Sequence, residues 1–137
     1  ESTRLIDLAD ILDISNFVEF RRCVPENNLV ELYSEATAVV YPSMEEPFGL
    51  VPLEAMACGT PVIACRTGGT SETIIDGETG FLIDPYDLTQ LVEKIGFMLS
   101  NPTRAEEMGL SARKHVMQKF SWLKTAKEIS ELCELHD

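Results

Sequence analysis

The sequence predicts an α/β fold in which helices cover both faces of a parallel, Rossmann-like sheet. Short apolar runs alternate with segments of helical periodicity along most of the 137 residues. The connections between the apolar runs are long enough to contain a helix, as parallel neighbouring strands require. These runs are apolar throughout, which is typical of strands buried on both faces. A chain of this length is expected to form one domain, residues 1–137.

Four apolar runs are expected to be strands, and seven segments carry helical spacing or helix-end signals. The expected strands are residues 17–20, 36–41, 61–65 and 81–83. The expected helices are residues 3–12, a segment capped by Asn27 or Asn28, one that starts at about residue 49 and ends before the C′ glycine Gly59, residues 70–75 and 88–99 (capped by Asp87), a segment opening at Pro102, and one capped by Ser121. Tyr33 is expected in the core, Trp122 as an anchor of the last helix, and His115 on a solvated helix face.

The stretch from Tyr41 to Gly59, YPSMEEPFGLVPLEAMACG, combines a strand end, an acidic loop and a helix. Ligands of open α/β sheets bind at the carboxyl ends of the strands, so this loop is a candidate site. A helix start also presents unpaired N–H groups and a partial positive charge. Here the amides are roughly those of residues 48–51. This end of the helix can therefore hold a phosphate or the hydroxyls of a sugar.

Two carboxylates flank this helix start in an E-x7-E spacing, Glu46 before the helix and Glu54 one turn into it. Helical side chains lean toward the N-terminus, so Glu54 can reach the same end as Glu46. Acids near a helix start are also favoured by the helix dipole alone. The spacing therefore leaves two interpretations open, a binding site or a dipole-stabilised helix start.

The segment EEPFGLVPLEAMACGTPVIA resembles the nucleotide-sugar-binding motif of retaining GT-B glycosyltransferases, specifically the group 1 family (family 4). The resemblance continues through RTGGTSETIIDGETGFLIDP and KFSW, from about residue 16 to the C-terminus. It implies the C-terminal donor-binding domain of such an enzyme, without its first two strands and the helix between them. The implied reaction transfers a hexose from a nucleoside-diphosphate sugar to an acceptor, and the isolated fragment is expected to be inactive.

The resemblance also implies roles for individual residues of the motif. Glu46 is expected to be catalytic and to contact the hydroxyls of the donor sugar, and Glu54 to hydrogen-bond the nucleotide ribose. Glu72 has a weaker claim, because an acid at a helix start is explained equally well by the dipole. The residues expected to hold the donor sugar and diphosphate are Glu46, Pro47, Phe48, Gly49, Leu50, Gly68 and Gly69.

Two parts of such an enzyme are not found in these 137 residues. One is the Arg–Lys pair that neutralises the departing diphosphate, and the other is the N-terminal domain that binds the acceptor. Arg66 is the one base beside the motifs, and nothing in the sequence shows that it replaces the pair. The resemblance implies no metal and no other cofactor; the implied partner is the nucleotide-sugar donor.

Composition and charge exclude several other classes of function. The 23 acidic and 11 basic residues give a net charge of −12, which argues against nucleic acid or an anionic membrane as partner. The four cysteines lack a metal-binding spacing, which indicates reduced thiols. No apolar run is long enough to span a membrane. We expect a cytoplasmic protein, peripheral at the cytoplasmic membrane face in its full-length form, that self-associates through an exposed sheet edge.

Two other functions remain open at this point. A glycosidic-bond phosphorylase on the same fold would use phosphate and a sugar phosphate, and would not depend on a nucleoside diphosphate. A non-catalytic interaction module would keep the fold without turnover. The combination of Glu46 and Glu54 beside Gly49 argues against the module, because a scaffold does not need it. The motifs do not identify the nucleotide base, the sugar or the acceptor.

Overall fold

A parallel sheet of three strands lies at the centre of the computed structural model, which describes residues 2–44 and 47–134. The strands are β1 (Val39–Tyr41), β2 (Val62–Cys65) and β3 (Gly80–Ile83), in the order β1-β2-β3. Their register places Val39 beside Val62, and Val62 beside Gly80. The parallel arrangement and the α/β class are as expected from the sequence.

Helices connect and flank the strands in the order expected. They are α1 (Ser2–Ile11), the 3₁₀ turn η1 (Ser15–Phe17), α2 (Glu26–Glu35), α3 (Leu50–Ala57), α4 (Thr70–Thr73), α5 (Leu88–Ser100), α6 (Pro102–Lys119) and α7 (Trp122–Glu134). Two helix starts follow their local signals. The Asp87 carboxylate accepts a 2.9 Å hydrogen bond from the Gln90 amide, and Pro102 occupies the first turn of α6. The Asn27 or Asn28 cap is wrong, because α2 begins one residue after Pro25.

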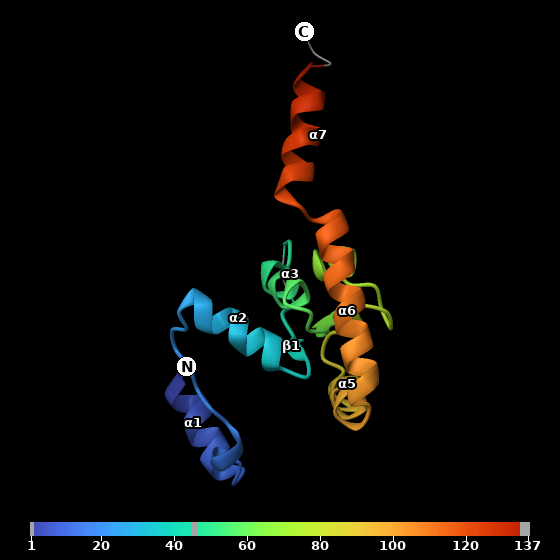
Figure 1. The fold of residues 1–137 in the computed structure, drawn as a ribbon. Coiled ribbons are helices and arrows are strands. Elements are labelled where there is room, and N and C mark those ends of the chain that lie inside the picture. Colours follow the sequence, from blue (N-terminus) through green and yellow to red (C-terminus); the bar gives the residue numbers. More distant parts are fainter. Residues whose placement is uncertain (1, 45–46, 135–137) are drawn as a thin grey trace.

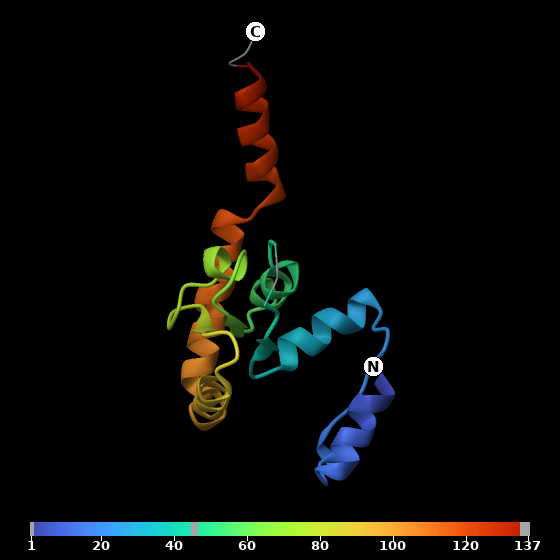
Figure 2. The ribbon, with the colours of Figure 1, turned by 180° about the vertical axis from the view of Figure 1, so that it is seen from behind.

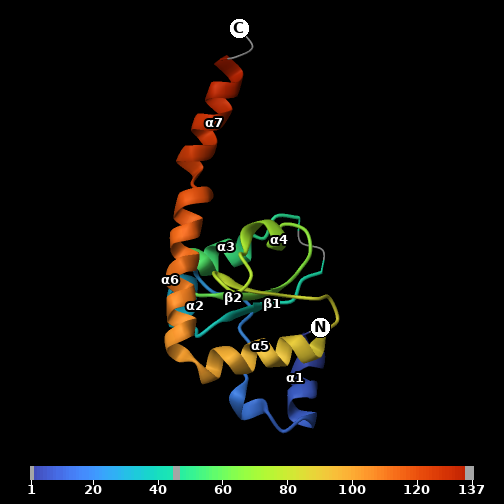
Figure 3. The ribbon, with the colours of Figure 1, turned by 90° about the vertical axis from the view of Figure 1, so that its right-hand side faces the viewer.

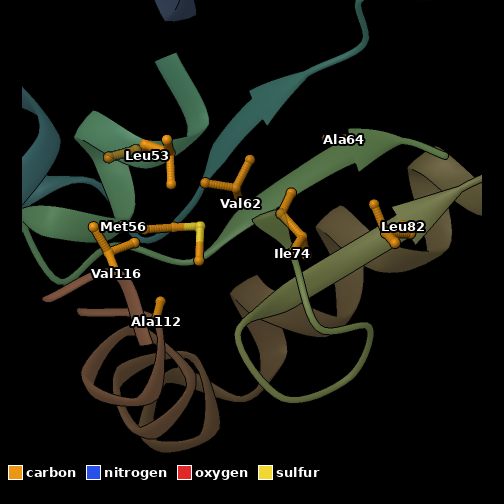
Figure 4. Packing of buried hydrophobic residues seen from close by; sticks show 9 residues of the cluster. Leu53, Met56, Val62, Ala64, Ile74, Leu82, Ala112 and Val116 are labelled. Carbon is orange, nitrogen blue, oxygen red and sulfur yellow. The ribbon is translucent and has the colours of Figure 1, made fainter. Parts of the chain in front are cut away.

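Two apolar clusters cover the two faces of the sheet, since successive strand residues point to opposite sides. Val62, Ala64 and Leu82 face α3 and α6, where they meet Leu53 and Met56 (Figure 4). The alternate strand residues point to the other face of the sheet, toward α5 and the start of α6. These residues are Ile63, Cys65 and Ile83, and they pack against Met98, Ala105 and Met108. Figure 3 shows α3 and α4 above the sheet and α5 below it. This layering brings the start of α3 and the loop after β2 to the same side.

The expected strand at residues 17–20 is wrong. Ser15–Phe17 form the 3₁₀ turn η1, and residues 18–20 have no regular structure. Val18 has extended dihedral angles (φ −123°, ψ 126°), as its sequence favours. A strand also needs a neighbour to receive its hydrogen bonds, and no described strand lies beside this segment. Figures 1 and 2 show this part of the chain away from the sheet, next to α1.

The two terminal helices project away from the sheet. In Figure 1, α7 extends beyond the end of α6, and α1 lies on the far side of α2. Trp122 is 85% exposed, so its expected role as an anchor is wrong. The expected solvated position of His115 is also wrong. This side chain is buried on the inner face of α6, with an exposure of 9%.

The outer edge of β3 is closed by the chain's own side chains and backbone. Asp76 Oδ1 accepts a 3.0 Å hydrogen bond from the Leu82 amide, and Arg66 Nη2 donates to the Leu82 carbonyl at 3.2 Å. The Gly77 amide donates to the Gly80 carbonyl at 2.8 Å. These bonds occupy the backbone groups that an added strand would use. The edge of β3 is therefore not the exposed edge expected from the sequence. In the described sheet β1 is the other edge strand, and self-association through its outer edge stays a prediction.

Candidate functional site

The start of α3 is the centre of the candidate site, at the carboxyl end of β1. Gly49 is the N-cap of α3 and has a left-handed conformation, with φ 88° and ψ 51°. Glycine adopts this conformation without the steric cost that a Cβ atom would add. The turn lets α3 begin immediately after the loop, with the amides of Leu50 and Val51 in its first turn, where helix geometry provides no acceptor. The helix start is formed where the sequence predicted it, and the binding of an anion there stays a prediction.

The loop after β2 lies in direct contact with the loop before α3. A Cβ atom added to Gly69 would lie 2.2 Å from the carbonyl oxygen of Phe48, far inside van der Waals contact. Only glycine therefore allows these two backbones to approach so closely. Gly68, beside it, is exposed and has φ 45°. The structure thus brings together the two segments expected to hold the donor.

Threonine side chains fix this pair of loops. The Thr67 hydroxyl donates to the carbonyl of Ser43, in the loop after β1, over 3.4 Å. The buried Thr70 hydroxyl lies 2.5 Å from the carbonyl oxygens of Cys65 and Thr67. Thr70 is the first residue of α4, in the segment expected to be a helix, and its hydroxyl bonds back to the carbonyl oxygen of Cys65 in β2. No spacing rule signals this role, because the partner carbonyls belong to the preceding strand and turn.

The remaining expected site residues surround the helix start. Pro47, Phe48 and Leu50 are exposed, Phe48 at 50% and Leu50 at 58%. Glu46 lies outside the described residues, so its expected catalytic role stays a prediction. Glu72 is exposed in the first turn of α4.

Glu54 lies on the exposed side of α3, at the rim of a groove between α2 and α3. The groove has a volume of about 260 Å³ and is lined by Glu26, Leu29, Val30, Tyr33, Glu54, Ala57 and Cys58. The Tyr33 hydroxyl donates to Glu54 Oε2 over 3.4 Å. Tyr33 was expected only to fill the core, and its half-buried ring does pack against it. Its contact with Glu54 had no signal in the sequence, because 21 residues separate them.

Arg66, the one base beside the motifs, is engaged at the edge of β3. Its guanidinium forms a 2.7 Å ion pair with Asp76 and lies 4.0 Å from Asp84. Partial burial raises the pKa of Asp76, but the hydrogen bond from Leu82 and the Arg66 charge outweigh burial and lower it overall. Asp76 therefore stays ionised and holds Arg66. This pairing does not support Arg66 as a substitute for the diphosphate-binding bases.

The described part of the chain has neither a metal-binding cluster nor a membrane-spanning helix. No group of three or more His, Cys, Asp or Glu residues there is placed to hold a metal ion. None of the helices in residues 2–44 and 47–134 combines the length and apolar character needed to cross a membrane.

The parallel sheet, the glycine-started helix and the close-packed glycine loop at the strand ends are the architecture on which α/β domains commonly bind phosphates or nucleotides. The family described as "Glycosyl transferases group 1" matches residues 1–115, and the chain belongs to this family. The resemblance noted in the sequence is thereby confirmed at the level of the family.

Similar proteins support this assignment. D-inositol 3-phosphate glycosyltransferase of Acidothermus cellulolyticus is 42% identical over 129 residues, covering 94% of this chain and 28% of that protein. Sucrose-phosphate synthase of Thermosynechococcus elongatus is 38% identical with a TM-score of 0.90, covering 97% of this chain and 33% of the other. The Anabaena protein HepE, in complex with UDP-glucose, is 27% identical with a TM-score of 0.87, covering 97% and 36%. The chain thus spans about a third of the length of these proteins.

Proposed function

We propose that these residues form the donor-binding part of a retaining glycosyltransferase, which transfers a hexose from a nucleoside-diphosphate sugar to an acceptor. Transfer itself would be a property of the whole enzyme, and the 137-residue chain alone would bind the donor without turnover. The observation that carries the proposal is the contact of the Gly69 backbone with Phe48 beside the start of α3. This contact joins two backbone segments at the carboxyl ends of two neighbouring strands.

The proposed roles follow from the chemistry of each group. The amides at the start of α3 would bind the diphosphate, because a helix start favours negative charge. Glu54 would accept hydrogen bonds from the ribose hydroxyls, since an ionised carboxylate is an acceptor only. Glu46 would orient the departing sugar. The complex of HepE with UDP-glucose supports a nucleotide sugar as the ligand class. No metal has a role in this proposal.

The test is a titration of the 137-residue chain with UDP, GDP and ADP, followed by amide chemical shifts. We expect weak binding by at least one nucleotide, with the largest shifts at residues 48–51 and 67–69. Shifts confined to other parts of the chain, or no shift with any of the three nucleotides, would contradict the proposal. Inorganic phosphate is titrated in parallel. Equal or stronger binding of phosphate at the same amides would favour a phosphorylase instead.

Matched variants connect the binding to the proposed groups. Glu54→Gln removes one negative charge at the groove, and Glu106→Gln removes one on the exposed side of α6. We expect Glu54→Gln to weaken nucleotide binding by about three- to thirtyfold, because hydrogen bonds to charged groups contribute roughly 1.5–3 kcal/mol and this one is partly solvated. Glu106→Gln should leave the affinity unchanged. Equal effects of the two variants would show that only overall charge matters.

A further inference from the structure

The backbone of Tyr33 is hydrogen-bonded to the segment that follows α3. Its carbonyl oxygen accepts a hydrogen bond from the hydroxyl of Thr60, which is buried just after α3. The Thr60 amide in turn donates to the Ala55 carbonyl, over 3.1 Å. These bonds fix the C-terminal end of α2 to the end of α3. The position of the Tyr33 backbone relative to α3 is therefore set by these bonds.

The Tyr33 side chain spans the core and the groove. Its ring packs against the apolar cluster under α3, and its hydroxyl reaches the groove, where it donates to Glu54 Oε2 over 3.4 Å. Partial burial raises the pKa of Tyr33, and the negative charge of Glu54 raises it further. The phenol thus keeps its proton at neutral pH and remains a donor. A carboxylate has lone pairs to spare, so Glu54 can accept from a ligand at the same time.

We propose that Tyr33 is a positioning residue, whose hydroxyl holds the Glu54 carboxylate at the rim of the α2–α3 groove in the orientation that receives the ribose hydroxyls of a nucleoside diphosphate. The inference rests on the proposed function and adds a residue to its site. An exposed glutamate samples several rotamers, and ordering it on ligand binding costs conformational entropy. A partner that orders the side chain beforehand reduces this cost. Tyr33 therefore acts on affinity through Glu54.

Tyr33→Phe tests the proposal, because it removes the hydroxyl and keeps the ring that packs against the core. The readout is the affinity of the 137-residue chain for UDP and for 2′,3′-dideoxy-UDP, which lacks both ribose hydroxyls. We expect Tyr33→Phe to weaken UDP binding by about two- to tenfold and to leave dideoxy-UDP binding unchanged. In a double-mutant cycle it should add little to Glu54→Gln, since the two residues act as one unit. Tyr86→Phe, at an exposed tyrosine outside the groove, is the control and should change neither affinity.

The outcomes separate this inference from the function on which it rests. If Glu54→Gln weakens UDP binding and Tyr33→Phe does not, the role of Tyr33 is overturned and the proposed function stands. An equal loss for UDP and dideoxy-UDP in Tyr33→Phe would show general loosening of the groove and would also overturn it. Absence of nucleotide binding by the wild-type chain overturns both proposals. If Tyr33→Phe does not fold, Glu54→Asp is used instead, because its shorter side chain moves the carboxylate away from the Tyr33 hydroxyl. An unchanged affinity of this variant for UDP overturns the inference.

Discussion

The imidazole of His115 lies inside the molecule, between α6 and α4. Its ring is in edge contact with Phe120 at a centroid distance of 5.7 Å, and its Nε2 atom has no hydrogen-bond partner in the described part of the chain. Burial lowers the pKa of His115, and the charge of Lys119 lowers it further. A backbone hydrogen bond with Thr73 and the charge of Glu78 oppose these effects only in part. The neutral ring is therefore the form that the fold accepts.

Acid should destabilise the domain through this residue. An unfolded histidine has a pKa of about 6.5, so below that pH the unfolded state binds a proton that the folded state resists. The contribution of His115 is fully present above about pH 6.5 and is lost as the pH falls toward its lowered folded pKa. Denaturant unfolding between pH 8 and 5 measures this dependence. In His115→Gln, whose side chain cannot titrate, the free energy of unfolding should depend less steeply on pH below pH 6.5. An unchanged slope would contradict the role of His115 in the acid sensitivity.

At the scale of elements, the closed edge of β3 depends on Asp76. Its two carboxylate oxygens bind different groups, the Leu82 amide at 3.0 Å and the Arg66 guanidinium at 2.7 Å. Arg66 in turn covers the Leu82 carbonyl. Loss of the carboxylate therefore frees the Leu82 amide directly and releases the arginine that occupies its carbonyl. Both groups would then be available to another strand.

Asp76→Ala should open this edge. We expect a loss of roughly 1–2 kcal/mol in the free energy of unfolding, at the lower end for a half-exposed group. We also expect increased association by strand pairing, visible as larger species in sedimentation and as added β signal in circular dichroism. Asp84→Ala is the control, because Asp84 lies 4.0 Å from Arg66 and does not bind Leu82. Equal association of the two variants would contradict the role of Asp76.

Local signals predicted the elements whose causes are local. The Asp87 cap and Pro102 at the start of α6 depend on neighbours within a turn, and both were expected from the sequence. The segment at residues 17–20 has strand composition, but no strand among the described residues lies beside it. Strand pairing depends on parts of the chain that are distant in sequence. In the site, the Gly49 turn follows from local φ/ψ chemistry. The contact between Gly69 and Phe48 and that between Tyr33 and Glu54 depend on tertiary packing, which spacing alone does not encode.

At the scale of the whole molecule, the parts that stand away from the sheet carry much of the exposed apolar surface. Three exposed apolar residues of α7, spaced by seven and three, lie along one face: Trp122 (85%), Ile129 (56%) and Leu132 (61%). Leu123 (84%) is exposed at the border of this face. The segment from α1 to Phe20 also exposes apolar side chains, among them Leu8, Ile11 and Phe17. Figure 2 shows α1 and α7 at opposite ends of the molecule. The β3 edge, by contrast, is closed by Asp76 and Arg66.

We therefore expect the 137-residue chain to self-associate through α7, with a second copy covering its apolar face. Two amphipathic helices that pair bury this face in both copies, and the ion pairs of Lys124 with Glu128 and Lys127 with Glu131 can stay in solvent. Sedimentation velocity over a hundredfold range of concentration should show monomers converting to dimers.

The double variant Ile129→Glu with Leu132→Glu should stay monomeric, because pairing of α7 would then bury two charged side chains. Leu8→Glu with Ile11→Glu, the same change on α1, should leave association intact. A wild-type monomer at all concentrations contradicts the expectation, and association lost only in the α1 variant would place the interface there instead.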